Sequence, residues 1–191
     1  MQQQHTLILG GQKSGKSRYA EWMAGDWLAA APTHRAILIA TAYAHDSEMA
    51  ERIARHRSDR AARVPQLQTQ EETLAVAECI AQRSRPDTLL VVDCLNLWLT
   101  NMLMPMRAED ALPPEHIHAQ TAALQHALAQ APGPVVLVSN EIGLGLIPMQ
   151  PAVRHFVDEL GLLNQALAQS CAQVLLMVAG LPLQIKSAAA V

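Results

Sequence analysis

The sequence predicts an α/β fold in which a mostly parallel central sheet is flanked by helices. Five short runs are nearly continuous in valine, isoleucine and leucine, at residues 6–9, 36–41, 88–93, 135–139 and 173–179. Such runs are typical of strands that are buried on both faces of a parallel sheet. The segments between them have helical spacing, and strands that alternate with helices favour right-handed crossovers within one open sheet.

Five segments between and after these strands are expected to be helical. Four of them span residues 16–30, 47–57, 115–130 and 153–171, and Pro151 introduces the last one. A further helix is expected to begin near residues 69–72, with Thr69 as its cap and acidic residues in its first turn. After Gly180 and Pro182, residues 183–186 are expected to add a short antiparallel edge strand. The chain shows no internal repeat or linker, so we expect a single domain over residues 1–191.

Composition limits the function classes. The chain has 191 residues, of which 50% are hydrophobic and 16% charged, which is enough for one substantial core. A net charge of -3 argues against a general nucleic-acid binder, which would carry a basic excess. The three cysteines are scattered, which favours buried thiols in a reducing compartment. Because there is neither a signal-peptide pattern nor an apolar stretch of about 18 residues, we expect a cytoplasmic protein without a membrane span.

A glycine-rich segment directly follows the first predicted strand and precedes the first predicted helix. It reads Gly10-Gly11-Gln12-Lys13-Ser14-Gly15-Lys16-Ser17 and satisfies G-x-x-x-x-G-K-[ST]. Glycines let successive N–H groups point into one concavity that binds phosphate, and the helix adds its positive end. Lys16 is expected to reach the β- and γ-phosphates, and the Ser17 hydroxyl to ligate Mg²⁺. A chance match is disfavoured by this strand–helix context, so the sequence predicts a P-loop NTPase fold.

Asp93 ends the predicted strand at 88–93. A carboxylate at this position is typical of a Walker-B residue, which holds Mg²⁺ directly or through water. The alternative is an aspartate that caps a helix starting at Cys94. We favour the Mg²⁺ role.

His56 lies in a cluster of basic residues that also contains Arg52, Arg55, Arg57 and Arg60. A histidine among arginines is disfavoured as the imidazolium, so it should remain neutral and nucleophilic near pH 7. Beside a bound triphosphate it could attack the α-phosphorus and form a covalent nucleotidyl-histidine. From the residues alone, a solvated histidine on a charged helix is the commoner situation, and both interpretations stay open.

With these residues placed, the chain resembles the bifunctional adenosylcobinamide kinase and adenosylcobinamide-phosphate guanylyltransferase family of cobalamin biosynthesis. The resemblance covers nearly the whole chain, and its strings from Asp93 to Asn101 and from Ser139 to Pro148 are more specific than the P-loop. The strings are Leu9-Gly10-Gly11 with Ser14-Gly15-Lys16-Ser17-Arg18, Glu48-Met49 with Arg52-Ile53 and His56-Arg57, Val92-Asp93-Cys94-Leu95 with Leu97-Trp98-Leu99, and Ser139-Asn140-Glu141 with Gly143, Gly145 and Pro148.

The resemblance implies a two-step enzyme. ATP or GTP first phosphorylates adenosylcobinamide; GTP then guanylylates a histidine, and GMP passes to adenosylcobinamide phosphate to give adenosylcobinamide-GDP. The family's guanylylated histidine falls on His56. Its nucleotide contacts fall on the P-loop and on Ala40, Thr41, Ala42, Arg57, Ser58, Asp59, Arg60, Glu71 and Asp93. The resemblance also implies a homotrimer.

Two alternatives remain: a single-activity P-loop kinase in which His56 merely binds phosphate, and a nucleotide-dependent switch. The base for the kinase step is not evident from the residues. Glu141, just past the strand that ends at Ser139, is one hypothesis, because ligands bind at the carboxyl ends of parallel strands. The alternative is a loop carboxylate that caps backbone amides, and the two are evenly weighted.

Overall fold

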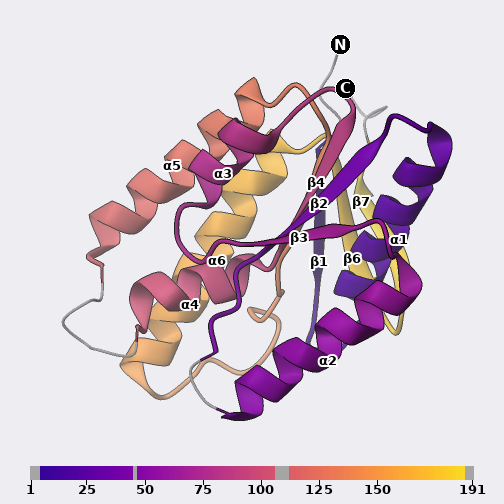
Figure 1. The fold of residues 1–191 in the computed structure, drawn as a ribbon. Coiled ribbons are helices and arrows are strands. Elements are labelled where there is room, and N and C mark those ends of the chain that lie inside the picture. Colours follow the sequence, from indigo (N-terminus) through magenta and orange to yellow (C-terminus); the bar gives the residue numbers. More distant parts are fainter. Residues whose placement is uncertain (1–4, 45–46, 106–111, 188–191) are drawn as a thin grey trace.

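Seven strands form one sheet in the order β3-β2-β4-β5-β1-β6-β7 (Figure 1). The computed structural model describes residues 5–44, 47–105 and 112–187. The strands are β1 (Thr6–Gly10), β2 (Arg35–Ala40), β3 (Gln68–Glu71), β4 (Thr88–Asp93), β5 (Val135–Val138), β6 (Gln173–Val178) and β7 (Leu181–Lys186). β7 pairs with β6 in antiparallel fashion, and all other pairs are parallel. The mostly parallel sheet with an antiparallel carboxyl-terminal edge is therefore confirmed.

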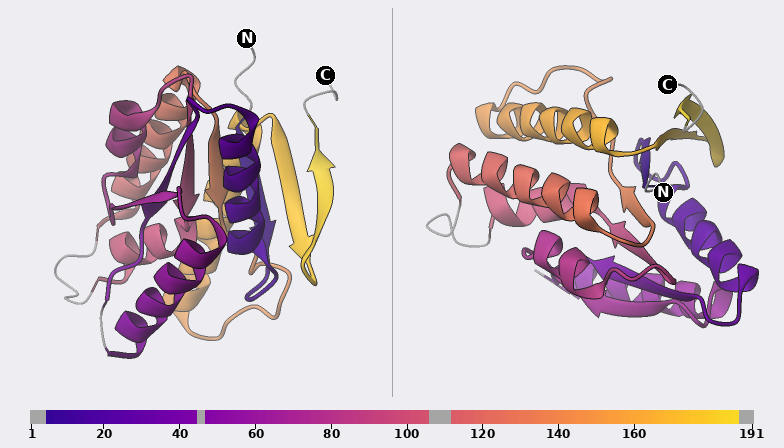
Figure 2. Two further views of the ribbon diagram at one scale, coloured as in Figure 1. Left: turned by 45° about the vertical axis from the view of Figure 1, so that its right-hand side comes forward. Right: turned by 90° about the horizontal axis from the view of Figure 1, so that it is seen from above.

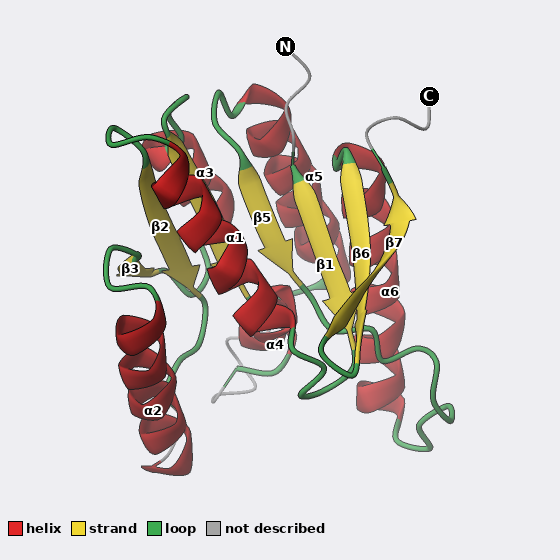
Figure 3. Cartoon of the chain, turned by 90° about the vertical axis from the view of Figure 1, so that its right-hand side faces the viewer, coloured by secondary structure: helices red, strands yellow, loops and turns green. Residues whose placement is uncertain are grey.

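The helices divide into two covering layers and one helix outside them. They are α1 (Lys16–Ala30), α2 (Ser47–Arg63), α3 (Val76–Arg83), α4 (Leu95–Leu103), α5 (Pro114–Gln130) and α6 (Pro151–Ser170). α1 crosses one face of the sheet, whereas α5 and α6 lie on the other (Figures 2 and 3). α2 lies beyond the carboxyl ends of the strands rather than on a face (Figure 3). In the described ranges no helix has both the length and the apolar character to cross a membrane.

Alternate strand residues fill two separate cores, as period-2 side-chain direction requires. Leu7, Val92 and Leu137 pack with Trp98 and Leu160 on the α3–α6 face. On the α1 face, Ile8, Val91, Val136 and Val138 pack with Ala20 and Ala24. Both faces of the central strands are thus covered, which explains why these strands are apolar without alternation.

The apolar runs locate the five predicted strands to within one residue at each end. The helix expected to begin near residues 69–72 is wrong: this segment is β3, and α3 begins only at Val76. β3 was missed because its residues Gln68–Glu71 are polar and mostly exposed; it is a strand because its backbone pairs with β2. The helix expected at 47–57 continues to Arg63, and the edge strand begins at Leu181.

His5 joins three elements at the amino ends of the strands. Its Nε2 donates to the Leu128 carbonyl at 2.8 Å, and the Val135 N–H donates to its Nδ1 at 3.2 Å. The ring is buried, and burial lowers its pKa below the ordinary value, an effect that the Leu128 carbonyl opposes. The neutral imidazole therefore fits this position, because both ring nitrogens are used in complementary roles.

Candidate active site

The P-loop backbone follows a path that only small residues permit. Gly10 and Gly15 have φ values of 152° and 101°. A Cβ on Gly10 would lie 2.6 Å from both the Met177 carbonyl oxygen and Ser14 Oγ. A Cβ on Gly15 would approach Gly180 Cα at 3.1 Å. The two glycines are thus required by backbone conformation and by close packing, Gly10 against β6 and Gly15 against the β6–β7 turn.

Lys16 begins α1 and is buried at the mouth of the loop. Its Nζ donates to the Gly11 carbonyl at 2.7 Å. Burial lowers the pKa of the amine, while Cys94 and the Asp93 carboxylate oppose this change. An ammonium in this position faces the concavity of the loop, where a phosphate oxygen is a stronger partner than a carbonyl.

Asp93 is the point on which several predicted site residues converge. Burial raises the pKa of its carboxyl group, whereas a hydrogen bond from the Ser17 hydroxyl and the charges of His56, Arg60 and Lys16 oppose the rise. α4 has no side-chain cap, and the residue at its cap position is Cys94. The geometry therefore supports the pairing of Asp93 with Ser17 rather than the capping alternative.

Ser17 and Asp93 also fit a magnesium ion chemically. A hydroxyl and a carboxylate, hydrogen-bonded at the start of α1 and the end of β4, supply the oxygen ligands that Mg²⁺ prefers. Mg²⁺ keeps several waters and binds protein through one or two such groups plus phosphate oxygens. Two ligands beside a phosphate loop are therefore sufficient.

The segment after β2 is fixed across the end of β4. The fully buried Thr41 hydroxyl donates to the Cys94 carbonyl at 2.7 Å and accepts from the Cys94 N–H at 2.9 Å. Asn101 Nδ2 donates to the carbonyls of Thr41 and Thr73 at 2.9 and 3.0 Å. Thr41 therefore connects the segment after β2 to the residues that follow β4. These bonds position its half-buried neighbours Ala40 and Ala42 at the edge of the site.

α2 is held to the body of the molecule by polar contacts of its arginines. Arg57 forms an ion pair with Glu71 of β3. Arg60 is buried and donates from Nη2 to Thr69 Oγ1 at 2.9 Å. Arg63 donates from Nε to the buried Glu21 of α1 at 2.8 Å. Between α2 and β3 lies an open groove of about 610 Å³ lined by Arg57, Arg60, Ala61, Pro65, Leu67, Thr69 and Glu71.

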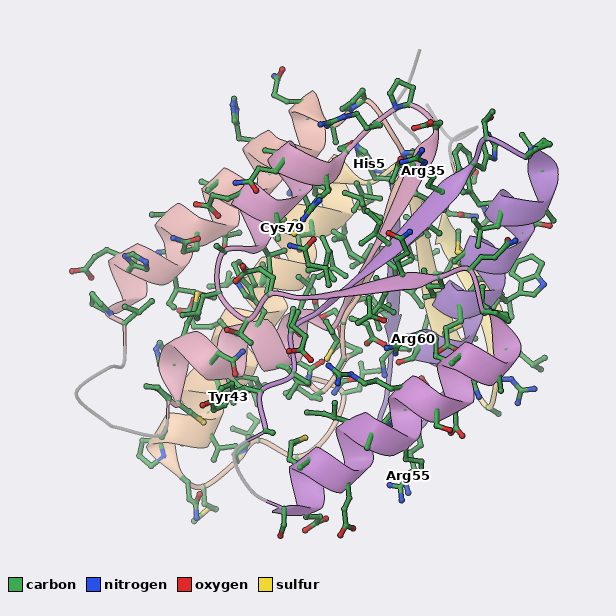
Figure 4. The ribbon with its side chains drawn as sticks, viewed as in Figure 1. His5, Arg35, Tyr43, Arg55, Arg60 and Cys79 are labelled. Carbon is green, nitrogen blue, oxygen red and sulfur yellow. The ribbon has the colours of Figure 1, made fainter. Side chains whose placement is uncertain are left out.

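His56 is exposed on α2, one helical turn before Arg60. His56, Arg60 and Lys16 all lie close enough to Asp93 to oppose the rise in the pKa of its carboxyl group. Figure 4 shows Arg60 on the side of α2 that faces the sheet, whereas Arg55 points away from it. Ser58 and Asp59 are exposed residues of the same helix. The structure therefore turns Arg60 toward the sheet and leaves Arg55 outside, whereas His56 is exposed one turn before Arg60.

Some functional contacts escaped the sequence analysis. Thr69 was expected to cap a helix, but it is the partner of Arg60. The Arg63–Glu21 pair joins residues 42 positions apart, and no local pattern marks it. Glu141 accepts the Gly143 N–H at 2.9 Å through Oε1, as the capping alternative expects.

Comparisons with known proteins identify close relatives. The model of the CobU family, described as cobinamide kinase / cobinamide phosphate guanyltransferase, matches residues 6–185. The bifunctional adenosylcobalamin biosynthesis protein CobP of Pseudomonas aeruginosa is 44% identical over 180 residues, covering 94% of this chain and 96% of that protein. The similarly named CobU proteins of Escherichia coli and Salmonella typhimurium are 34% and 35% identical, each over 94% of this chain and 98% of its own length.

Solved structures show the same fold at low identity. A protein of Pyrococcus horikoshii OT3 has a TM-score of 0.57 at 9% identity, over 96% of this chain and 86% of its own. The flagellar accessory protein FlaH from Methanocaldococcus jannaschii has a TM-score of 0.52 at 12% identity, over 96% of this chain and 78% of its own. These two similarities concern the fold alone.

Proposed function

This chain belongs to the cobinamide kinase / cobinamide phosphate guanyltransferase family, and from that premise we propose that one site around Asp93 carries out both steps. The family's activities use a nucleoside triphosphate and a corrinoid. The proposed reactions are phosphorylation of adenosylcobinamide by ATP or GTP, and transfer of GMP from GTP to the product through His56. The observation that carries the proposal is the position of Asp93, whose carboxyl group accepts a hydrogen bond from Ser17 at the start of α1 and lies near enough to Lys16, His56 and Arg60 for them to oppose the rise in its pKa.

In the kinase step, the P-loop amides and Lys16 hold the β- and γ-phosphates. The hydroxyl of the corrinoid side chain attacks the γ-phosphorus, the bond to the β-phosphate oxygen breaks, and the hydroxyl proton is released. Ser17 and Asp93 would hold Mg²⁺, which when bound neutralises charge on the phosphates. The chain's own contribution is to position the reacting groups and stabilise charge through fixed donors.

In the guanylyl step, a neutral His56 nitrogen attacks the α-phosphorus of GTP and pyrophosphate leaves. A phosphate oxygen of adenosylcobinamide phosphate then attacks the same phosphorus, the P–N bond breaks, and His56 is regenerated. Arg60 supports this role because it is buried, faces the sheet and lies one turn from His56. Its planar guanidinium suits the charge that develops on phosphate oxygens. The groove between Arg60 and Glu71 is the proposed place for the rest of the nucleotide.

The test is covalent labelling. Wild-type protein is incubated with Mg²⁺ and GTP carrying ³²P at the α-phosphate, then denatured and assayed for label that is stable in base and lost in acid. We expect label on the wild type and none on His56→Ala. The matched control is His155→Ala, which removes an exposed histidine of α6 and should leave labelling unchanged. Labelled wild type should pass GMP to adenosylcobinamide phosphate.

Other outcomes separate the alternatives. Phosphorylation of adenosylcobinamide without label on any variant would leave a kinase in which His56 only binds phosphate. GTP binding without either transfer would indicate a nucleotide-dependent switch. Label that persists on His56→Ala would place the covalent site elsewhere.

Two further features belong to the proposal: the single domain carries both steps, and the chain assembles as a homotrimer. What supports assembly is exposed apolar surface at one end of the sheet, where Leu181, Leu183 and Ile185 of β7 are 71%, 59% and 59% exposed. Such a surface is characteristic of an interaction site. Light scattering coupled to size-exclusion chromatography should give three times the 20.7 kDa chain mass; a monomer at micromolar concentration would contradict it.

The proposed compartment is the cytoplasm. The three cysteines are free thiols, and burial raises the pKa of both Cys94 and Cys171 to about 12. Thiols that stay protonated and unpaired suit a reducing compartment. Fractionation of cells that express the tagged chain tests this placement.

A further inference from the structure

The carboxyl end of β5 lies between the two strands that supply the phosphate and magnesium residues. We propose that Asn140, two residues beyond β5, contacts the terminal phosphate of the bound triphosphate and stabilises it during phosphoryl transfer. The inference rests on the proposed kinase step and adds a residue to it.

The sheet order and register place Asn140. β5 is hydrogen-bonded to β1 on one side and to β4 on the other, so its end stands between the P-loop and Asp93. Val138 is the register partner of Asp93 and packs in the α1-side core. Asn140 follows Val138 by two residues and therefore shares that face, the face on which Ser17 of α1 meets Asp93.

The strand pattern continues past the end of β5, so this alternation holds at Asn140. The Ser139 N–H donates to the Ile8 carbonyl at 2.9 Å, and the Glu141 N–H donates to the Gly10 carbonyl at 3.0 Å. These two bonds repeat at the two-residue interval of a parallel ladder. Asn140 is consequently carried alongside Gly10, the first residue of the phosphate loop.

Asn140 is also held from the other side. Asn164 of α6 is 5% exposed and donates from Nδ2 to the Asn140 carbonyl at 3.0 Å. The peptide group that follows Asn140 is therefore bonded at both of its polar atoms, its carbonyl to α6 and its N–H to β1. A side chain on so constrained a backbone is pre-organised, and its half-buried amide loses little freedom on binding a ligand.

The spacing suits a phosphate group. Parallel strands lie about 4.8 Å apart and rise about 3.3 Å per residue, so Asn140 stands roughly 8 Å diagonally from Asp93. A bound triphosphate whose β- and γ-phosphates are held by Lys16 would place its γ-phosphate between Asp93 and Asn140. The Asn140 amide would then donate to a γ-phosphate oxygen. Glu141 faces a different partner, because its carboxylate accepts from Gly143.

The discriminating measurement is selectivity between nucleoside tri- and diphosphate. Variants are made in a His56→Ala background, so that guanylylation does not consume the ligand. In the presence of Mg²⁺, dissociation constants are measured for two ligands. One is GDP, and the other is a GTP analogue whose β- and γ-phosphates are joined by an imido group. Loss of one charge-assisted hydrogen bond changes an affinity or a rate by approximately 10- to 100-fold. Asn140→Ala should weaken analogue binding by about 10-fold with GDP affinity unchanged. Asn140→Asp, which puts a carboxylate against phosphate, should weaken analogue binding further.

The matched control is Ser139→Ala. The Ser139 hydroxyl is fully buried without a hydrogen-bond partner among the described residues, and by alternation it lies on the α3–α6 face. Its removal should leave both dissociation constants and phosphorylation of adenosylcobinamide unchanged. Asn140→Ala should lower kcat for phosphorylation by roughly 10- to 100-fold.

The outcomes separate the inference from the function it rests on. If the His56→Ala parent phosphorylates adenosylcobinamide and Asn140→Ala matches it in both selectivity and kcat, the assignment of Asn140 is overturned. Equal losses of GDP and analogue affinity would also overturn it, because they indicate a general distortion of the loop. If neither the wild type nor the parent phosphorylates adenosylcobinamide, the kinase proposal fails. The affinity ratio then still decides whether Asn140 contacts the γ-phosphate.

Discussion

The two sides of the nucleotide site are built in opposite ways. The phosphate side comes from the ends of β1, β4 and β5, central strands of the sheet whose side chains fill both cores. The other side is α2, which lies beyond the sheet and whose anchors are largely arginine contacts to Glu71, Thr69 and Glu21. The first is positioned by apolar packing; the second is positioned by charge.

This difference matches the division of chemistry in the proposed function. Phosphoryl transfer depends on fixed donors around the phosphates, and rigid strand ends supply them. The proposed nucleophile His56 is instead on the polar helix, which shares little core with the rest of the molecule. Substitutions on the phosphate side should therefore affect both steps, whereas substitutions on α2 should affect mainly the guanylyl step.

The largest effect is expected at Lys16. Lys16→Ala removes the ammonium that holds the β- and γ-phosphates, and loss of one such donor lowers a rate by roughly 10²- to 10³-fold. Both adenosylcobinamide phosphorylation and covalent GMP labelling should fall, as measured by product formation and by ³²P retention. Arg83→Ala is the control, because it removes an exposed cation at the end of α3, outside the phosphate loop. Retention of either step in Lys16→Ala would break the idea of one shared phosphate site.

Arg60 and Arg55 form a matched pair on α2. Arg60→Ala removes a buried guanidinium that faces the sheet, and Arg55→Ala removes an exposed one that points away (Figure 4). Arg60→Ala should slow covalent labelling by about 10- to 100-fold, whereas Arg55→Ala should change it less than about twofold. Initial labelling rates at fixed GTP measure both. Equal effects would show that only the net charge of α2 matters.

The Arg63–Glu21 pair tests how α2 is attached. Arg63→Ala leaves the Glu21 carboxylate buried without its ion-pair partner, which should lower the free energy of unfolding by about 1–3 kcal/mol. Adding Glu21→Gln should recover part of this loss, because the buried charge is gone. Urea unfolding of the single and double variants gives the coupling free energy. Additive losses would mean that the pair contributes nothing to holding the helix.

The smallest expected effect is on the free energy of unfolding when His5 is replaced. His5 lies on the strand side of the molecule rather than on α2. Its folded-state pKa lies below the ordinary 6.5 because of burial, so the unfolded chain binds more protons in this range. The contribution of the neutral His5 ring to the free energy of unfolding is complete above pH 6.5. It is lost as the pH falls toward the folded-state pKa. At pH 7.5, His5→Gln should be about 1 kcal/mol less stable than the wild type.

The pH dependence provides the check on His5. Urea unfolding at several pH values between 7.5 and 5 should show the difference between wild type and His5→Gln shrinking toward the acid end. GTP-over-GDP selectivity should stay the same in this variant, because His5 lies at the amino ends of the strands. A difference that grows toward acid pH would contradict a neutral buried imidazole.

The apolar runs were sufficient to predict the central strands, and the P-loop motif located Lys16 and Ser17. These features are local: a strand covered on both faces must be continuously apolar, and a phosphate loop needs glycines at Gly10 and Gly15. β3 escaped prediction because polar, exposed residues become a strand only when a neighbour supplies hydrogen-bond partners. For the same reason Thr69 was assigned to a helix cap.

What the sequence determined by itself is the mostly parallel α/β fold, the phosphate loop and the family to which the chain belongs, since each is written in contiguous residues. Only the tertiary structure decided that Asp93 pairs with Ser17, that Arg60 rather than Arg55 faces the sheet, and that Asn140 stands beside Gly10. These relations join residues that lie far apart along the chain. The relations of Asp93 and Asn140 follow from the strand order, which places β5 between β1 and β4, and that of Arg60 follows from its contact with Thr69 of β3; no local pattern of residues encodes either.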